Sequence, residues 1–196
     1  KEITMENELI DIRSDILNAI KNNKPIVALE STLISHGLPY PQNLKVAQES
    51  IQAVEESGSV AATIGIFNGK IKVGLLQEDL ITLAKNDKVE KISNHNLSIM
   101  LALLRNGATT VASTIMIANK VGIKYFATGG IGGVHINAEK TFDISADIKE
   151  LSNTPINVVC SGAKSILDLD KTYEMLETFG ISRIGYQTNY MPGFWY

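Results

Sequence analysis

The sequence predicts an α/β fold of three layers, α/β/α, with a central mixed, mostly parallel sheet and one β-hairpin. Short apolar runs alternate with amphipathic stretches, the pattern of strands and helices that succeed each other in a largely parallel sheet. Asn68-Gly69 separates two β-rich runs, and this dipeptide is the strongest short signal for a hairpin. No internal repeat or Pro/Gly-rich linker interrupts the 196 residues, which predicts a single domain over 1–196.

Each predicted element follows from the spacing of its apolar residues. Over 7–22, Leu9, Ile12 and Ile16 recur at helical spacing, and over 42–57 a second helix is followed by Gly58 as its C-terminal cap. Short apolar runs predict buried strands. The predicted helices are 7–22, 42–57, 77–85, 95–106, 114–121 and 165–179. The predicted strands are 25–29, 60–67, 70–75, 108–113, 124–128, 156–160 and 183–187.

The bulk composition argues against several classes of protein. A net charge of -3 provides no basic surplus to neutralise a nucleic-acid backbone, although a small phosphorylated ligand needs only a local pocket. Cys160 is the only cysteine, so no disulfide forms within the chain. No apolar run reaches membrane-spanning length. We therefore expect a cytoplasmic protein that binds a small molecule and has no nucleic-acid or membrane partner.

Polar and small residues follow several of the predicted strands. Glu30 comes directly after the first strand, and Ser113-Thr114, Thr128 and the stretch that leads to Lys164 follow later ones. Ligands of open α/β sheets bind in the crevice beyond the carboxyl ends of the strands. The sequence therefore predicts one cleft where an acid, hydroxyl groups, glycine-rich backbone and a lysine converge.

Lys164 and Glu30 are the two residues in this cleft best suited to covalent and acid–base chemistry. Lys164 lies between an apolar run and the helix predicted from Ser165, and both surroundings favour the neutral amine that attacks a sugar carbon. The alternative interpretation is that Lys164 is an ordinary lysine whose amine reaches the surface. Glu30 ends a hydrophobic strand, where burial suits a carboxyl group to general-acid catalysis near neutral pH. It could instead cap nearby backbone or pair with a lysine.

Two further stretches suggest ligand contacts. Residues 128–135 carry four glycines and end in His135, and such loops expose backbone N–H groups that bind phosphate, although a plain tight loop is the alternative. The loop lacks the spacing of a dinucleotide fingerprint. Asp143 and Asp147 are four residues apart and offer oxygen ligands for Mg²⁺ or Mn²⁺, but an aspartate also serves as a helix cap.

Several long motifs together resemble the pseudouridine-5′-phosphate glycosidase family, also described as pseudouridylate synthase or indigoidine synthase A-like. They occur in the family's order and spacing from Lys24 to the end of the sequence. The motifs are ALEST (28–32), HGLP (36–39), PQN (41–43), NGATTVAST (106–114), ATGGIGGVH (127–135), TFDISAD (141–147), CSGAKSILD (160–168) and LETFG (176–180).

The resemblance implies an enzyme that reversibly cleaves the C–C glycosidic bond of pseudouridine 5′-phosphate to give uracil and ribose 5-phosphate. It implies that Lys164 is the Schiff-base nucleophile and that Glu30 is the general acid at the ribose ring oxygen. It further implies a homotrimer, and a Mn²⁺ or another divalent cation held by Asp147 largely through waters. The residues implied in substrate binding are Lys91, Thr110, Val111, Thr128, Gly129, Gly130, His135 and Ser145.

Family chains continue beyond the point where this sequence stops, so we expect it to be the N-terminal two thirds of a longer chain. Two other functions are compatible with the same residues. One is a Schiff-base lyase that acts on another sugar phosphate, and the other is a non-catalytic module that binds a phosphoribosyl group. A nicotinamide oxidoreductase rests on the glycine-rich loop alone and is the weakest interpretation.

Overall fold

The computed structural model describes residues 9–194 and confirms the α/β class. Within them, eight strands form a mixed sheet of order β1-β4-β3-β2-β7-β8, to which β6 is added beside β3 and β5 beside β6. These strands are β1 (Ile10–Ile12), β2 (Ile26–Leu29), β3 (Val60–Phe67), β4 (Lys70–Val73), β5 (Glu90–Ile92), β6 (Gly107–Thr109), β7 (Tyr125–Ala127) and β8 (Asn157–Val159). A separate two-stranded sheet joins β9 (Ala163–Lys164) and β10 (Gly193–Phe194).

Most pairings in the large sheet are parallel, and β3 supplies the exceptions. β3 runs antiparallel to β4 and to β6, whereas β2 pairs in parallel with both β3 and β7. The predicted hairpin is confirmed between β3 and β4. Asn68 and Gly69 both have positive φ, 49° and 70°, which is the backbone that a two-residue type I′ turn requires.

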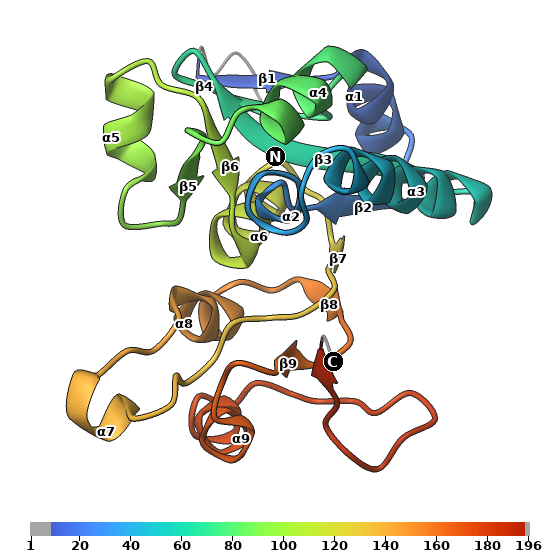
Figure 1. The fold of residues 1–196 in the computed structure, drawn as a ribbon. Coiled ribbons are helices and arrows are strands. Elements are labelled where there is room, and N and C mark those ends of the chain that lie inside the picture. Colours follow the sequence, from blue (N-terminus) through green and yellow to red (C-terminus); the bar gives the residue numbers. More distant parts are fainter. Residues whose placement is uncertain (1–8, 195–196) are drawn as a thin grey trace.

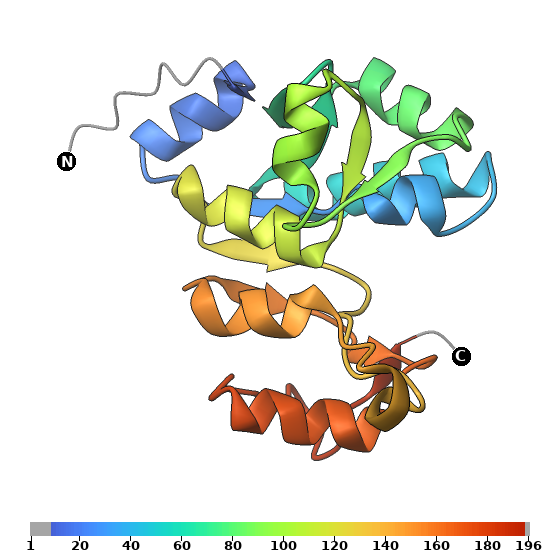
Figure 2. The same ribbon diagram turned by 90° about the vertical axis from the view of Figure 1, so that its left-hand side faces the viewer.

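The helices cover the sheet on two sides (Figure 2), as a three-layer arrangement requires. They are α1 (Ser14–Lys21), α2 (Thr32–His36), α3 (Gln42–Glu56), α4 (Gln77–Lys85), α5 (Leu97–Ala102), α6 (Val111–Lys120), α7 (Ala138–Thr141), α8 (Ala146–Asn153) and α9 (Leu169–Thr178). α1 and α6 share one hydrophobic cluster, and α2, α3 and α4 share a second. None of the described helices has the length and apolar character needed to cross a membrane.

Strand β3 separates the two hydrophobic clusters because its side chains alternate between the faces of the sheet. Ala62, Ile64 and Ile66 belong to the cluster under α1 and α6, whereas Phe67 belongs to the cluster under α2, α3 and α4. Both cores therefore depend on the same strand.

After β7 the chain returns once to the main sheet as β8, and the rest of it forms α7, α8, α9 and the small β9–β10 sheet in the lower part of Figure 1. α8 packs against α6, and Ile148 of α8 and Leu176 of α9 join the larger core. The lower part is thus attached to the sheet through apolar contacts.

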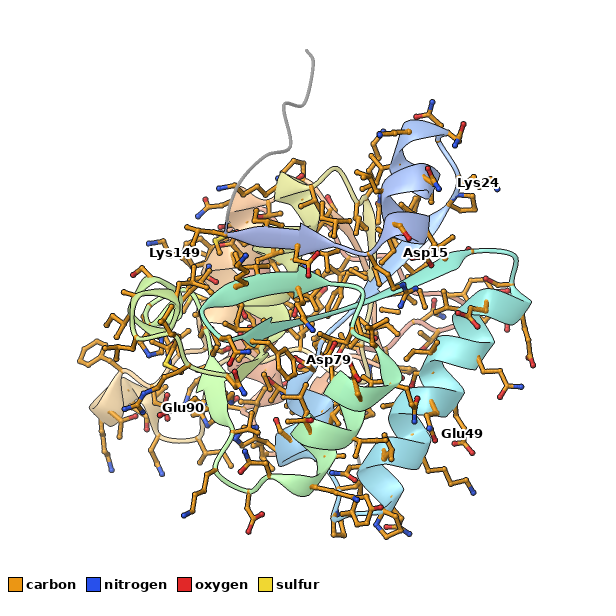
Figure 3. All side chains as sticks on the ribbon, turned by 90° about the horizontal axis from the view of Figure 1, so that it is seen from above. Asp15, Lys24, Glu49, Asp79, Glu90 and Lys149 are labelled. Atoms are coloured by element: carbon orange, nitrogen blue, oxygen red, sulfur yellow. The ribbon has the colours of Figure 1, made fainter. Side chains whose placement is uncertain are left out.

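Charged side chains lie mainly at the periphery. Lys24 and Glu49 are exposed at the outer surface in Figure 3. Asp79, at the start of α4, is buried and lies 2.8 Å from the amine of Lys72 on β4. It also accepts a hydrogen bond from the backbone N–H of Leu76, so it anchors the first turn of its helix.

Several predicted boundaries are wrong. Residues 7 and 8 of the first predicted helix lie outside the described part, and Ile10–Ile12 forms β1 because it pairs with β4, so the helix begins only at Ser14. The strand predicted over 108–113 ends at Thr109, and α6 begins at Val111 instead of residue 114. Residues 183–187 form no strand, and Ile184 there is 94% exposed.

Short elements escaped the sequence prediction. α2, α7, α8 and β5 were not expected, because each is too brief for a clear hydrophobic period. The helix predicted over 165–179 begins at Leu169, capped by the Asp168 side chain, and residues 163–164 form β9. Lys164 therefore does not lie at a helix N-terminus, and that part of the argument for a neutral amine is wrong.

Candidate active site

The site begins where the parallel neighbours β2 and β7 end. Their register pairs Leu29 with Ala127, so Glu30 and Thr128 leave the sheet side by side. The Thr128 hydroxyl donates a hydrogen bond to the Glu30 carboxylate. The expected convergence at the carboxyl ends of these strands is therefore present in the structure.

Glu30 is an acid whose pKa the site perturbs. Burial raises the pKa of its carboxyl above the ordinary value, and the nearby negative charge of Asp147 acts in the same direction. The hydrogen bond from Thr128 and the positive charges of Lys164 and Lys91 oppose this rise. The four charged residues selected from the sequence thus lie within electrostatic reach of one another.

Lys164 is held beside the glycine-rich loop by backbone pairing. Its N–H donates to the carbonyl of Ile131 at 3.0 Å, and Ile131 forms a parallel bridge with Ala163. The lysine residue is partly buried. An extended strand, rather than a helix, thus presents this side chain.

Asp147 joins three segments of the chain through its buried carboxylate. One oxygen accepts the N–H of Ala112 in the first turn of α6 at 2.9 Å, and the other accepts the N–H of Gly132 at 2.8 Å. Ser145 caps α8 by accepting the N–H of Asp147 at 3.2 Å. Sequence reasoning missed Ala112 and Gly132, because a backbone N–H leaves no side-chain signal.

Three of the expected substrate-binding residues, Thr110, Val111 and Ser145, lie beside Asp147 or its hydrogen-bond partner Ala112. Thr110 caps α6 and is followed by the buried Val111. Ser145 packs so closely on Gly132 that a methyl group there would lie 2.7 Å from its Cβ. These residues, with Lys91 on β5 next to β6, form one side of the site.

His135 lies at the outer end of the loop. Its backbone N–H donates to the carbonyl of Asp143 at 3.0 Å, and its ring Nδ1 is 3.9 Å from that aspartate's carboxylate. The His135 side chain is 37% exposed, and that of Asp143 is 63% exposed. Asp143 and Asp147 do not share a helical face, because Asp143 precedes α8.

The glycine-rich loop directs much of its backbone toward the protein. The N–H groups of Ile131, Gly132 and Val134 donate to Gly162, Asp147 and Thr172, respectively. A phosphate bound on this loop would therefore meet the N–H groups of Gly129, Gly130 or Gly133.

Metal ligands are sparse. Among residues 9–194 no group of three or more His, Cys, Asp or Glu side chains is placed to enclose a metal ion. Each oxygen of Asp147 accepts one N–H and keeps a further lone pair for a metal-bound water. This donor set fits a hard divalent cation held largely by water and does not fit an enclosed zinc site.

An apolar hollow of about 720 Å³ reaches the site from one side. Side chains of β2, β7 and α3 line it, and it meets the site at Glu30, Thr128 and Gly129. Lys164 and Asp147 do not line this hollow. The polar groups of the site and this apolar hollow are thus adjacent but distinct.

Together these features define an α/β protein in which a lysine, a partly buried acid and a second, buried carboxylate lie within electrostatic reach of one another. The chain belongs to the indigoidine synthase A-like protein family, whose model matches residues 15–196. It is 53% identical over 195 residues to pseudouridine-5′-phosphate glycosidase 2 of Photorhabdus laumondii, covering 99% of this chain. It is 54% identical over 194 residues to pseudouridine-5′-phosphate glycosidase of Escherichia coli, covering 98% of this chain. The chain spans 62% of the length of each relative.

Solved structures agree with this family. The prealnumycin C-glycosynthase AlnA in complex with ribulose 5-phosphate matches with a TM-score of 0.89 and 41% identity, over 96% of this chain and 61% of its own. An indigoidine synthase A-like protein of Thermotoga maritima matches with a TM-score of 0.85 and 36% identity, over 95% and 60%.

Proposed function

We propose that this chain carries the catalytic site of a pseudouridine-5′-phosphate glycosidase, which cleaves the substrate reversibly to uracil and ribose 5-phosphate. The observation that carries the proposal is the hydrogen-bonded pair Glu30 and Thr128 at the ends of the neighbouring strands β2 and β7, with Lys164 of β9 within electrostatic reach of Glu30. Relatives of that name that are more than half identical to this chain support the choice of substrate.

The mechanism follows from the chemistry of the bond. A C–C bond to uracil carbon cannot break as an ordinary glycosidic bond does, because the carbon is a poor leaving group. Protonation of the ribose ring oxygen by Glu30 opens the ring, while the Lys164 amine adds to C1′. The nitrogen lone pair then forms an iminium as the C1′–C5 bond breaks, and C5 of uracil takes up a proton. Water hydrolyses the iminium and releases ribose 5-phosphate.

The surroundings of Glu30 and Lys164 suit these roles. Burial, by raising the pKa of Glu30, keeps its proton available to the ring oxygen at higher pH. Lys164 and Lys91 both lie within electrostatic reach of Glu30, so the amine proposed as nucleophile is close to the proposed acid.

The phosphate and the metal complete the proposal. Thr110, Thr128, His135 and Ser145, with Gly129, Gly130 and the backbone at Val111, would contact the substrate and its phosphate. Asp147 would hold Mn²⁺ or another divalent cation through waters, and this cation would supply positive charge near the substrate oxygens. We also propose a homotrimer, which light scattering after size-exclusion chromatography tests directly.

A second candidate is the synthesis of a C-glycoside on another ring system. The similarity to a C-glycosynthase solved with ribulose 5-phosphate favours a pentose phosphate but leaves the ring partner open. Competition between uracil and other ring compounds for ribose 5-phosphate distinguishes the two activities.

The decisive experiment measures uracil release from pseudouridine 5′-phosphate in the presence of Mn²⁺. It is performed on this chain and on a chimera that appends the remaining segment of the Escherichia coli relative. Lys164→Ala should abolish both turnover and borohydride trapping of ribose 5-phosphate, whereas Lys171→Ala, at an exposed ion-paired lysine, should change neither. Absence of turnover in both proteins, or trapping that survives Lys164→Ala, would overturn the proposal.

A further inference from the structure

Strand β9, which carries Lys164, is bonded along both of its edges. On one edge the N–H of Lys164 donates to Ile131 of the glycine-rich loop at 3.0 Å. On the other edge the N–H of Ser165 donates to the carbonyl of Phe194 at 3.0 Å, and β10 pairs Phe194 with Lys164. Successive N–H groups of an extended strand point to opposite sides, which is why two different segments hold the lysine.

The ring of Phe194 lies against Gly129 and Gly130. A methyl group at Gly129 would overlap Cζ of this ring and would lie 2.8 and 2.9 Å from its two Cε atoms. A methyl group at Gly130 would lie 2.6 Å from Cδ1. Neither glycine has a left-handed φ, so what glycine contributes at both positions is space.

The rest of the C-terminal segment is also packed closely. The carbonyl of Pro192 lies over Gly162, whose φ of +91° and lack of a side chain permit the approach. Met191 packs against the larger hydrophobic core. Residues 191–194 are therefore fixed at several points, and Pro192 and Phe194 contact β9, Gly162 just before it, or the glycine-rich loop.

We propose that Phe194 is a positioning residue for Lys164, and that Gly129 and Gly130 lack side chains in order to admit its ring. The ring lies against the glycine pair, and the backbone carbonyl of Phe194 accepts a hydrogen bond at the second edge of β9. The inference rests on the proposed function for its link to catalysis. It also gives a separate reason for glycine at these two positions, because their N–H groups could bind phosphate whether or not a methyl group were present.

A double-mutant cycle tests this proposal. Phe194→Ala should lower the rate of borohydride trapping of ribose 5-phosphate on Lys164 by roughly tenfold to a hundredfold, the range expected when a reacting group is misplaced by about 1 Å. The concentration of ribose 5-phosphate at half saturation should stay unchanged, because the phosphate contacts are intact. Phe194→Leu should recover part of the rate.

Gly129→Ala alone should also slow trapping, because its methyl group displaces the ring. In the double variant, Phe194→Ala removes all three of the nearest atoms that this methyl group meets, so the combined effect should be no larger than that of Phe194→Ala alone. If the two losses multiply instead, the glycine serves the phosphate and the inference is overturned. Phe142→Ala, at a residue 83% exposed, is the matched control and should leave the rate unchanged.

A second measurement separates this inference from the proposed function. Formaldehyde with cyanoborohydride methylates lysines without any sugar, and peptide mass spectrometry gives the rate at Lys164 relative to Lys171 in the same sample. Phe194→Ala should change this ratio and should accelerate hydrogen exchange at Ser165. If wild type forms no ribose 5-phosphate adduct but both changes occur, only the proposed function fails. If the ratio and the exchange rate are unaltered, Phe194 does not position Lys164.

Discussion

Asp147 offers the most direct quantitative test of the site. Its buried carboxylate accepts the N–H groups of Ala112 and Gly132, and these donors belong to α6 and to the glycine-rich loop. In Asp147→Ala both N–H groups lose their acceptor. A buried donor left unsatisfied costs about 1–3 kcal/mol, so we expect the free energy of unfolding to fall by about 2–6 kcal/mol.

Asp147→Asn should lower the free energy of unfolding by less than Asp147→Ala does, because the asparagine amide retains one carbonyl oxygen. One of the two N–H groups then keeps an acceptor and the other faces an amide nitrogen, so the expected loss is about half as large, ~1–3 kcal/mol. Asp143→Ala is the matched control. Its side chain is 63% exposed, and such surface substitutions change stability by at most about 0.5 kcal/mol.

Urea denaturation followed by circular dichroism measures these differences at fixed pH and in the presence of a chelator. A loss below about 1 kcal/mol in Asp147→Ala would show that the two N–H groups find other partners, and would refute the bridging role. Adding Mn²⁺ tests the metal separately, because a ligand that binds only the native state raises its stability. Wild type should gain stability with Mn²⁺ and Asp147→Asn should not; a gain lost only in Asp143→Ala would move the metal to that residue.

Two further predictions concern pH and the core. The raised pKa of Glu30 means that the native state holds this proton more tightly than the unfolded chain does. Wild type should therefore lose stability relative to Glu30→Gln as pH rises from the ordinary value of 4.5 through the raised pKa, and urea titrations that show the opposite slope would contradict the burial. Asn43 is buried and donates to the carbonyls of Ile34 at 2.6 Å and Ala84 at 2.9 Å. Asn43→Ala should lower the melting temperature through a loss of about 2–6 kcal/mol, whereas the exposed Asn119→Ala should not; equal melting temperatures would disprove the link between α2 and α4.

The features predicted best from the sequence are the residues that lie at the ends of neighbouring strands. Glu30 and Thr128 each follow a recognisable apolar strand, and the parallel pairing of β2 with β7 brings them together. The hairpin was equally clear, since Asn68 and Gly69 tolerate the positive φ that the turn needs.

Features that depend on distant partners could not be predicted from local pattern. Leu9 and Ile12 are at helical spacing from Ile16, but pairing with β4 makes residues 10–12 a strand. Residues 163–164 are extended because the loop at Ile131 and the segment at Phe194 bond to β9 from both sides. A glycine-rich stretch is equally ambiguous in the sequence. A backbone without side chains can bind a phosphate, or it can pack against an aromatic ring from a distant part of the chain.

The alternation of side chains along β3 has a consequence for how the protein unfolds. Ile64 and Ile66 form part of one core and Phe67 forms part of the other. Detaching β3 from the sheet would therefore remove packing contacts from both cores. Neither core can melt while the other stays intact. The amide hydrogens of β3 should therefore exchange with solvent only when the whole main sheet opens, and calorimetry should show one cooperative transition for both cores.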